Sequence, residues 1–379
     1  MDPAQRPYDV GIVGAGQLAR MTCLAAAPLG IRVAVLGHDA EPAAAVAAGV
    51  VPGRWHEAGD VAALGALCTV VTLENEFVDA AALAAVEASG TPVRPTAASV
   101  GRIQDKALQK ALLRDAGLPV PEFHVMSDAR EADALGRDLG WPLVLKARTL
   151  GYDGYGNAIC ATPAEAADAL ARLDRGDGVL VEGLVRFTRE LAAMVARSTT
   201  GEELVYPVVE TRQRDHICHE VLAPAGGDAD VVARAAGVAS DAARAADALG
   251  VMGVEMFELP DGGVLVNELA PRPHNSGHYT IEACETSQFE NHVRGILGLP
   301  LGVVSMRAPS AAMINILGAR EGPAAPTLGP ALAVRGAHVH LYEKAEVRMG
   351  RKMGHVTALG DEREVARATA LRAAAEVGL

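Results

Sequence analysis

Short hydrophobic runs alternate with helical patterns through the first quarter of the chain. Val10–Val13, Ile31–Leu36 and Val70–Leu73 have the length and the β-branched character of buried strands, and a helical pattern follows the first of them. Strands that alternate with helices form a parallel sheet. We therefore predict a Rossmann-like α/β domain over residues 1–98.

The turn after the first run, Gly14–Ala19, has the pattern G-x-G-x-x-A. Its glycines let the backbone approach a ligand, and the start of the following helix favours an anion. A dinucleotide site also needs an acid directly after the second strand, and Asp39 lies late for that role. A phosphate-binding or purely structural turn is therefore favoured, and an NAD-dependent oxidoreductase stays as an alternative from another class.

Two acids, Glu74 and Glu76, follow the strand Val70–Leu73. The carboxyl ends of parallel strands are where open α/β sheets bind ligands. Either acid can therefore hold an amine or a hydroxyl of a substrate, and either can equally be an ordinary charge at the start of the next helix.

The segment Ser99–Ala116 predicts one helix with three cations at a spacing of four, namely Arg102, Lys106 and Lys110. That spacing places all three on one face, either against a ligand or in solvent. A later strand ends at Lys146, and the loop Thr149–Asn157 follows with three glycines. The amides of such a loop can close over phosphates, although it lacks the GK[ST] of a P-loop.

An acidic turn lies between the strands Val179–Val181 and Leu191–Ala196, with Glu182 at its start and Glu190 at its end. The backbone of such a turn can pair with the edge of an adenine, and one of the acids can bind ribose hydroxyls. The longest helical pattern, Ala229–Leu249, predicts an alanine-rich packing helix.

Two alternating hydrophobic runs, Val251–Leu259 and Val264–Leu269, flank an Asp-Gly pair and predict a β-hairpin with a two-residue turn. The register then sets Glu255 opposite Glu268. The apolar pairs of the same face are Phe257 with Val266 and Leu259 with Val264. Like charges opposite each other destabilise a sheet, and Mg²⁺ between the two carboxylates removes the repulsion. A solvated acidic hairpin is the alternative.

Two further segments are rich in groups that bind anions. The loop after the hairpin contains Arg272, His274, Asn275, Ser276 and His278. Beyond two predicted strands, Ala311–Leu317 and Ala337–Leu341, lies a run with Lys344, Arg348, Arg351 and Lys352. Glycines flank the last of these cations, which favours a phosphate clamp over a solvated loop.

Composition narrows the class of protein. Of 379 residues, 50% are hydrophobic and only 3% aromatic, which predicts two or three domains packed through small aliphatic side chains. The net charge of −13 argues against a nucleic-acid partner. The five cysteines include no CxxC, so they indicate neither disulfides nor zinc. A secretory leader and a membrane-length stretch are also lacking, so we expect a cytoplasmic protein with no membrane partner.

The order of these motifs resembles the 5-(carboxyamino)imidazole ribonucleotide synthase family, which are ATP-grasp ligases of purine biosynthesis. The resemblance spans nearly the whole chain. Its most specific motifs are NELAPRPHNSGH from Asn267 and GRKMGH from Gly350, and GYDGYG from Gly151 is less specific. It implies a multidomain fold of the α/β and α+β classes. A Rossmann-like pre-ATP-grasp domain would span 1–98, an ATP-grasp domain 99–302 with its lid at about 120–180, and a small β-rich domain 303–379.

The resemblance also implies a reaction. ATP would phosphorylate bicarbonate to carboxyphosphate, which, directly or through released CO₂, would carboxylate the amine of 5-aminoimidazole ribonucleotide. Mg²⁺ would neutralise phosphate charge, and the protein would supply positioning and electrostatic stabilisation. The family further suggests a homodimer.

Roles carry over by position. For ATP, the resemblance implies Arg102, Lys106, Lys146, Gly151, Tyr152, Asp153, Gly154, Tyr155, Gly156, Asn157, Glu182, Gly183, Leu184, Val185, Glu190, Gln213, Asn267 and Glu268. For Mg²⁺ it implies Glu255 and Glu268. For bicarbonate and carboxyphosphate it implies Arg272, His274 and Asn275, with Asp153 as a base for the amine. For the aminoimidazole ribonucleotide it implies Glu74, Tyr152, Asp153 and Ser276, and for its phosphate Lys344, Arg351 and Lys352.

The chain departs from the family pattern at Ala19, where glycine is usual, at Gln213, where many members have histidine, and at Ala270, where other ATP-grasp enzymes have asparagine. The predicted register also points Asn267 away from the face of Glu268. The alternatives within the ligases are a formate-using glycinamide ribonucleotide transformylase and a biotin carboxylase-like enzyme. A non-catalytic nucleotide-binding regulator would not need both a metal pair and a second phosphate clamp.

Overall fold

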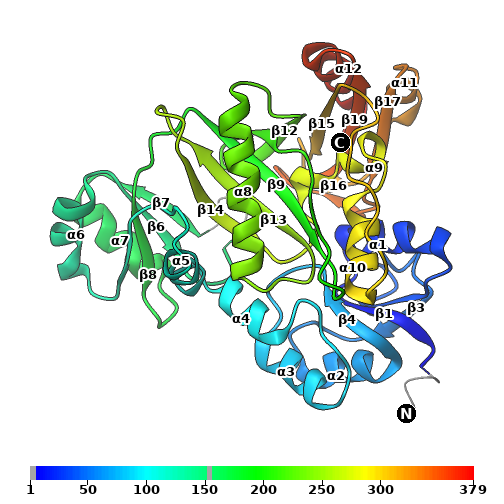
Figure 1. Cartoon of the computed structure of the whole chain (residues 1–379), viewed down its shortest axis with the longest axis horizontal. Coiled ribbons are helices and arrows are strands. Elements are labelled where there is room, and N and C mark those ends of the chain that lie inside the picture. Colours follow the sequence, from blue (N-terminus) through cyan, green and yellow to red (C-terminus); the bar gives the residue numbers. More distant parts are fainter. Residues whose placement is uncertain (1–5, 152–155) are drawn as a thin grey trace.

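The computed structural model describes residues 6–151 and 156–379. An N-terminal α/β domain is followed by a small lid that projects to one side, and then by a large sheet that continues into the C-terminal region (Figure 1). No helix within the described residues is both long enough and apolar enough to span a bilayer.

Four parallel strands in the order β3-β2-β1-β4 form the N-terminal sheet, which confirms the predicted Rossmann-like domain. The strands are β1 (Tyr8–Val13), β2 (Val33–Gly37), β3 (Gly49–Pro52) and β4 (Cys68–Leu73). The helices of this domain are α1 (Gln17–Ala26), α2 (Ala58–Leu67) and α3 (Ala80–Ala88).

The two faces of this sheet pack on helices from different parts of the chain. Leu64 of α2 and Leu83 of α3 belong to the core cluster on one face. On the other face, residues of α1 pack with Val293 and Ile296 of α10 (Gln288–Leu297). Because α10 comes from the central domain, a shared hydrophobic core holds the two domains together.

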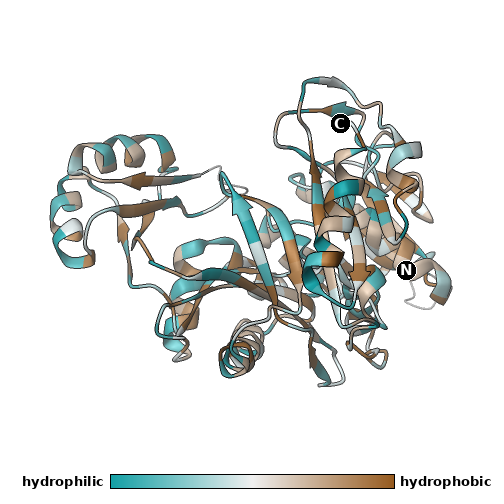
Figure 2. Ribbon diagram, turned by 90° about the horizontal axis from the view of Figure 1, so that it is seen from above, coloured by the Kyte–Doolittle hydropathy of each residue, from teal (hydrophilic) through white to brown (hydrophobic). Residues whose placement is uncertain are grey.

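The lid is an antiparallel sheet in the order β5-β8-β6-β7. Its elements are β5 (Phe123–Met126), α6 (Ala132–Leu139), β6 (Leu143–Ala147), β7 (Asn157–Cys160), α7 (Pro163–Leu173) and β8 (Val179–Gly183). Hydrophobic residues lie on its strands and hydrophilic residues on the outer surface of its helices, which is the pattern of a separate small core (Figure 2).

A nine-stranded sheet joins the central and C-terminal regions, in the order β14-β13-β9-β11-β12-β15-β19-β17 with β10 beside β9. Its strands are β9 (Arg189–Arg197), β10 (Glu203–Val205), β11 (Val209–Arg214), β12 (Ile217–Ala223), β13 (Gly250–Glu258), β14 (Val264–Ala270), β15 (Ser310–Leu317), β17 (Ala337–Leu341) and β19 (Lys352–Gly360). Because β12 pairs with β15, the sheet is continuous across the expected domain boundary at 302.

Several helices pack on this sheet, among them α10 against β9 and β13. The alanine-rich α8 (Ala229–Ala245) buries Ala235, Ala239 and Ala242 against β9, β13 and β14, as the packing prediction required. At the other end α12 (Arg363–Ala375) packs on β15 and β19. Short elements complete this region: α9 (Thr280–Ala283), α11 (Leu328–Leu332), β16 (Gly322–Pro323), β18 (Glu346–Val347) and a 3₁₀ turn at Asn275–Gly277.

The predicted helix Ser99–Ala116 is wrong, because it is two helices, α4 (Ala97–Gln104) and α5 (Lys106–Asp115). Between them Asp105 has an extended backbone, and its carboxylate accepts hydrogen bonds from two amides in the first turn of α5. A capping aspartate therefore ends one helix and starts the next, although the hydrophobic pattern runs through both.

The break separates the three cations that were expected on one helical face. Arg102 lies on α4, where it is exposed and its Nε donates to the carbonyl of Ala98. Lys106 opens α5, and Lys110 lies one turn later with a fully buried side chain. The predicted single face is therefore wrong, and Arg102 does not share a helix with the two lysines.

Candidate active site

The acidic hairpin forms as strands β13 and β14, and Glu255 lies opposite Glu268 as predicted. The rest of the register is wrong. The loop begins at Leu259, which was expected to pair with Val264, and Phe257 lies opposite Leu265, one position from its expected partner Val266. A bulge at Asn267 then restores the pairing of the two glutamates. The predicted pair is right because two changes of register cancel: the longer loop shifts the pairing by one residue, and the bulge shifts it back.

The bulge also changes the direction of Asn267. Simple alternation points this side chain away from Glu268, yet its Oδ1 accepts a hydrogen bond of 3.2 Å from the Nζ of Lys146. Glu268 acts on the same lysine through its charge. Asn267 and Glu268 therefore face one site, because a bulge interrupts the alternation of a strand.

The apolar residues expected beside the acids divide between two faces. Val264 and Val266 pack in the α8 core with Met256. Phe257 keeps the face of Glu255, where its ring stacks on that of Phe187 at 4.7 Å between centroids. The carboxylates are therefore bordered by an aromatic pair rather than by the aliphatic patch that alternation predicted.

The two facing glutamates differ in their electrostatic environments. Burial and the nearby charge of Glu268 raise the pKa of Glu255 to about 7. Burial also acts to raise the pKa of Glu268, but an ion pair with Lys106 and the charges of Lys146 and Lys110 together hold that pKa below its ordinary value. One carboxylate of the pair is thus ionised and the other half-protonated near neutral pH, and a bound cation would displace the remaining proton and relieve the repulsion.

A second group of charges lies directly behind this pair. The carboxylate of Glu182, only 3% exposed, is 2.9 Å from the Nζ of Lys110 and 2.6 Å from the Nζ of Lys146. Burial opposes its ionisation, but Lys146 and Lys110 lower its pKa to about 2. The Glu182 side chain, which was expected near adenine, thus binds two lysines instead. Any contact with adenine would be made by the backbone of Glu182–Val185.

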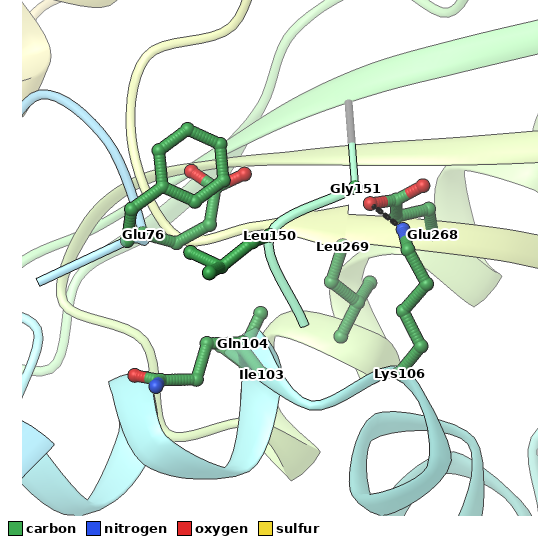
Figure 3. Close-up of a pocket in the computed structure, with 9 residues that line it drawn as sticks. Glu76, Ile103, Gln104, Lys106, Leu150, Gly151, Glu268 and Leu269 are labelled. Carbon is green, nitrogen blue, oxygen red and sulfur yellow. Dashed lines mark hydrogen bonds and ion pairs between the residues drawn. The ribbon is translucent and has the colours of Figure 1, made fainter. Parts of the chain in front are cut away.

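A cavity opens between α4, α5 and β14 (Figure 3). Figure 3 shows Lys106 reaching Glu268 on one side of it, with Gly151 next to Glu268 and Leu150 in the middle of the view. The residues that line it are Glu76, Phe77, Ile103, Gln104, Lys106, Leu150, Gly151, Glu268 and Leu269. The structure thus brings together three predicted parts: the lysine helix, the start of the glycine loop and the acidic hairpin.

The glycine loop is described at its ends only, and the predicted residues Tyr152, Asp153, Gly154 and Tyr155 lie outside the described residues. At Gly156 the backbone has φ of +102° and a Cβ would come within 3.1 Å of the Cα of Gly151. That position therefore requires glycine. Asn157 begins β7 and pairs with Lys146 of β6. The end of the loop therefore lies beside the lysine that was expected to bind the phosphates of ATP.

The turn expected to hold adenine has one of its amides engaged already. The amide of Leu184 donates to the carbonyl of Pro142, and the Leu184 side chain is exposed. At the end of the turn, Glu190 accepts hydrogen bonds from Thr211 and Gln213; burial raises its pKa and these bonds lower it. Gln213, which stands where the family often has histidine, therefore lies against the acid expected to bind ribose.

The residues of the anion loop make two kinds of contact: Arg272 forms an ion pair, and other residues form hydrogen bonds with side chains of the protein. Arg272 makes a two-pronged ion pair with Glu76, with 3.0 Å between its Nη2 and Oε1. His274 contacts the Oγ of Ser276 through Nδ1 at 2.8 Å, and its Nε2 lies 3.5 Å from a carboxylate oxygen of Glu255. Burial holds the pKa of His274 well below its ordinary value, so its imidazole is neutral.

Asn275 was expected to hold bicarbonate, but its side chain is 7% exposed and pairs with another amide. Asn275 and Asn315 exchange two hydrogen bonds of 2.9 and 2.7 Å. The contact joins the loop to β15 of the C-terminal region. Sequence reasoning missed Asn315, because the two residues are 40 positions apart.

Glu74 caps the helix after the glycine turn. Its carboxylate accepts hydrogen bonds from the amides of Gly16 and Ala19 at 2.7 and 3.2 Å, and burial raises its pKa. A Cβ on Gly14 or Gly16 would come within 2.7 Å of this carboxylate. The turn thus holds an anion of the chain itself, a carboxylate rather than a phosphate, which explains the glycines without a dinucleotide.

The three C-terminal cations lie around the start of β19. Lys344 donates to the carbonyl of Lys352 at 2.6 Å, and Arg351 donates to the carbonyl of Glu346 at 2.8 Å. The charge of Lys352 acts on both Glu255 and His274. The predicted clamp therefore adjoins the facing glutamates and the anion loop.

A separate group, Glu282, His340 and His355, has ligand atoms within 4.8 Å of one another among the described residues. The rings of His340 and His355 stack at 4.5 Å with 11° between their planes, so their in-plane lone pairs do not converge. His340 bonds to Glu282 at 2.6 Å and His355 to Tyr342 at 2.9 Å. These contacts are typical of packed hydrogen-bonding side chains rather than of a metal centre.

Three family models match the chain: a ribonucleotide synthetase preATP-grasp domain over residues 8–104, an ATP-grasp domain over 111–289, and a phosphoribosylaminoimidazole carboxylase C-terminal domain over 311–369. N5-carboxyaminoimidazole ribonucleotide synthase of Synechococcus elongatus is 40% identical over 92% of this chain and 88% of its own length. Phosphoribosylaminoimidazole carboxylase of Schizosaccharomyces pombe is 43% identical over 93% of this chain, which spans only 65% of that protein.

Solved structures agree with these relatives. Carboxyaminoimidazole ribonucleotide synthase of Aspergillus clavatus, complexed with ATP, has a TM-score of 0.89 and 37% identity, with 98% of this chain and 99% of that chain covered. N5-carboxyaminoimidazole synthase of the same organism, in complex with ADP and 5-aminoimidazole ribonucleotide, has a TM-score of 0.88 and 37% identity, with 96% of both chains covered.

Proposed function

The chain belongs to the N5-carboxyaminoimidazole ribonucleotide synthase family of ATP-grasp ligases, and we propose from this membership that it carboxylates the amine of 5-aminoimidazole ribonucleotide with ATP and bicarbonate, as a step of purine biosynthesis. One observation supports the proposal above all. The facing carboxylates Glu255 and Glu268 lie between the lysines of a nucleotide site and the residues of an anion loop.

The first half of the reaction needs positive charge at the phosphates of ATP. Lys106 and Lys146 supply it from α5 and β6, and Asn267 orients Lys146 through their hydrogen bond. Glu255 and Glu268 fit Mg²⁺, because the two residues lie opposite each other on the hairpin, and burial together with the charge of Glu268 raises the pKa of Glu255. When bound, Mg²⁺ supplies neutralisation of phosphate charge.

An oxygen of bicarbonate attacks the γ-phosphorus of ATP, ADP leaves, and carboxyphosphate forms, which completes the first half. The amine of the ribonucleotide then bonds to the carboxyl carbon, phosphate leaves, and the amine loses a proton. Arg272 lies at this place with its charge partly neutralised by Glu76, and the neutral His274 offers a ring nitrogen beside it. Asp153 or the departing phosphate accepts the amine proton.

The ribonucleotide binds on the C-terminal side of the metal pair. Lys344, Arg351 and Lys352 hold its phosphate at the start of β19. This placement is supported by the charge of Lys352, which acts on Glu255 and His274 and therefore puts a second anion site next to the first.

Release of ADP tests the proposal. We expect it to require bicarbonate, Mg²⁺ and 5-aminoimidazole ribonucleotide together, with a carbamate as the product. Formate with glycinamide ribonucleotide should give none, which separates this enzyme from the formate-using transformylase. Equal release of ADP with and without bicarbonate would refute the proposed function.

The proposal includes a cytoplasmic homodimer, as the family suggests. Sedimentation equilibrium at micromolar concentration is expected to give twice the mass of the chain. A single species with the mass of one chain would contradict the dimer without affecting the proposed reaction.

A further inference from the structure

We propose that Lys110, which lies beneath the nucleotide site, is a positioning residue: it leaves the Lys146–Glu182 pair with a net positive charge toward the phosphates of ATP and holds strand β14 in register. The inference rests on the proposed ATP site and goes beyond it, since it concerns a residue with no expected contact with the nucleotide. Its side chain is 2% exposed, and it extends from α5 into the core below β14.

The first step of the argument is the number of charges. Lys110 and Lys146 share one carboxylate, that of Glu182, so the three side chains carry one net positive charge. The side chains of Lys110 and Glu182 are 2% and 4% exposed, whereas that of Lys146 is 12% exposed. The surplus charge is therefore presented at Lys146, on the side of the site. Without Lys110, the carboxylate would neutralise Lys146 completely.

The second step is the position of the strand. The Nζ of Lys110 donates to the carbonyl of Val266 at 3.1 Å, directly before the bulge at Asn267. On the other side of the bulge, the side chain of Gln109 exchanges hydrogen bonds with the amide and carbonyl of Leu269. Two neighbouring residues of α5 thus hold β14 on both sides of the bulge that directs Asn267 and Glu268 toward one site.

The third step is the strength of the coupling. Charges in the interior are screened weakly by salt and water, so the removal of one buried ammonium is felt at its neighbours. Burial lowers the pKa of Lys110 to about 8, and Glu182 opposes that shift. The lysine is thus still mainly protonated at neutral pH, as its role requires.

Binding of nucleotides to Lys110→Met tests the proposal. We expect the dissociation constant of ATP to rise by about tenfold or more, that of ADP by less, and that of adenosine by less than about threefold, because the lost charge acts on phosphates. A merely structural role would weaken all three ligands alike. The matched control is Arg114→Met, which removes an exposed cation from the same helix and should leave all three constants unchanged.

A rescue experiment tests the shared charge itself. Lys110→Met combined with Glu182→Gln removes both buried charges and again leaves one net positive charge on Lys146. We expect this double variant to bind ATP at least about tenfold more tightly than Lys146→Met does, even if the single Lys110→Met variant fails to fold. The proposal is overturned if the folded single variant binds ATP like the wild type, or if the double variant binds ATP as weakly as Lys146→Met.

ADP release by the wild-type enzyme distinguishes a failure of the proposed function from a failure of the role of Lys110. If its ADP release does not depend on bicarbonate, the proposed function fails whatever the variants do. If the release depends on bicarbonate and the ATP constants of Lys110→Met and the double variant match the wild type, only the role of Lys110 fails.

Discussion

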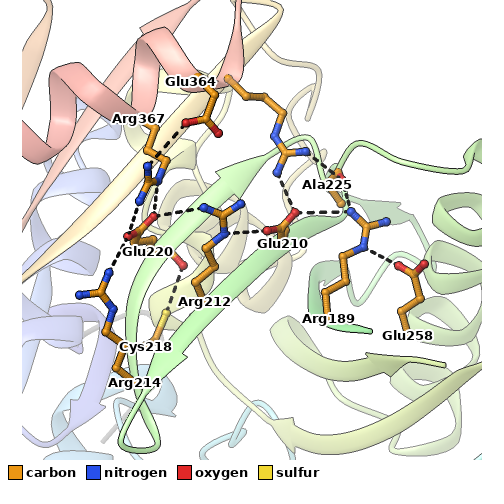
Figure 4. A network of polar contacts seen from close by, with 11 residues as sticks. Arg189, Glu210, Arg212, Arg214, Cys218, Glu220, Ala225, Glu258, Glu364 and Arg367 are labelled. Carbon is orange, nitrogen blue, oxygen red and sulfur yellow. Dashed lines mark hydrogen bonds and ion pairs between the residues drawn. The ribbon is translucent and has the colours of Figure 1, made fainter. Parts of the chain in front are cut away.

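Two clusters of buried charge on the central sheet differ in how completely their carboxylates are paired. The first is the candidate site around Glu255 and Glu268. The second, which we call the joint cluster, ties β9, β11 and β12 to α12 (Figure 4). Its members are Arg189, Glu210, Arg212, Arg214, Glu220, Glu258, Arg363 and Arg367.

In the joint cluster Glu210 and Glu220 each have several arginine partners, and Glu258 pairs with Arg189. Glu220, 2% exposed, accepts from two nitrogens of Arg367 and lies within 3.4 Å of Arg214, and these contacts hold its pKa below the ordinary value. At the site, by contrast, Glu255 faces another carboxylate and its pKa is raised to about 7. Fully paired carboxylates hold domains together, whereas an underpaired carboxylate is available to a ligand.

The largest effect is expected for Glu268→Gln. Loss of one of two facing carboxylates should lower kcat for ADP release by about 100-fold or more, because phosphate charge is no longer neutralised, while the fold is kept. Steady-state kinetics and circular dichroism measure both. A near-normal kcat would contradict the proposal that Glu255 and Glu268 bind Mg²⁺.

The matched control for that variant lies on the same hairpin. Glu258 belongs to the joint cluster through its ion pair with Arg189. Glu258→Gln should therefore keep kcat within about twofold of the wild type and lower the unfolding temperature instead.

The second effect concerns the joint cluster alone. Glu220→Gln removes the charged partner of Arg367, which is only partly exposed, and should reduce the free energy of unfolding by about 2 kcal/mol. Chemical denaturation is the measurement, and kcat of the folded fraction should not change. A loss of activity without a loss of stability would show that the two clusters are not separate.

The third effect is a pH dependence that only the site should show. Glu255 must be ionised to bind a cation, so affinity for Mg²⁺ or Mn²⁺ should be about tenfold weaker at pH 6 than at pH 8. The sign for stability is opposite: with the folded pKa raised, the contribution of this group to the free energy of unfolding falls as pH rises from about 4.5 to about 7. Titration of Mn²⁺ by electron paramagnetic resonance measures the first effect, and Glu255→Gln should remove the pH dependence of both.

The smallest effect is expected for a single capping hydrogen bond, and it shows how much one local contact contributes to the free energy of unfolding. Thr162 caps α7 of the lid by accepting a hydrogen bond from the amide of Glu165. Thr162→Ala should lower the free energy of unfolding by about 1 kcal/mol and leave kcat unchanged. A larger loss of stability than that of Glu220→Gln would contradict the ranking of the joint cluster.

Local patterns predicted much of the fold. The Rossmann-like domain, the hairpin, the packing helix and the C-terminal strands were found from hydrophobic periodicity and turn residues, which act over a few neighbouring positions. The same patterns failed where one residue redirected the chain. Asp105 split a helix, and the bulge at Asn267 reversed the direction of a side chain.

The partners of charged groups were the hardest to predict. Glu182 and Glu74 were assigned to ligands from their positions after strands, yet one binds two lysines and the other caps α1. Their partners lie far away along the chain, 58 residues in the case of Glu74 and Gly16. No local pattern encodes such a distance.

The sequence by itself therefore determined the family, the order of the elements and the presence of two facing carboxylates, because motifs and periodicity are properties of neighbouring residues. Only the tertiary structure decided which carboxylates are satisfied by the chain and which remain for a ligand. Glu268 and Glu182 look alike in the sequence. The packing of α5 against β14 buries Glu182 between two lysines, whereas it gives the more exposed Glu268 one lysine, Lys106, beside a facing carboxylate.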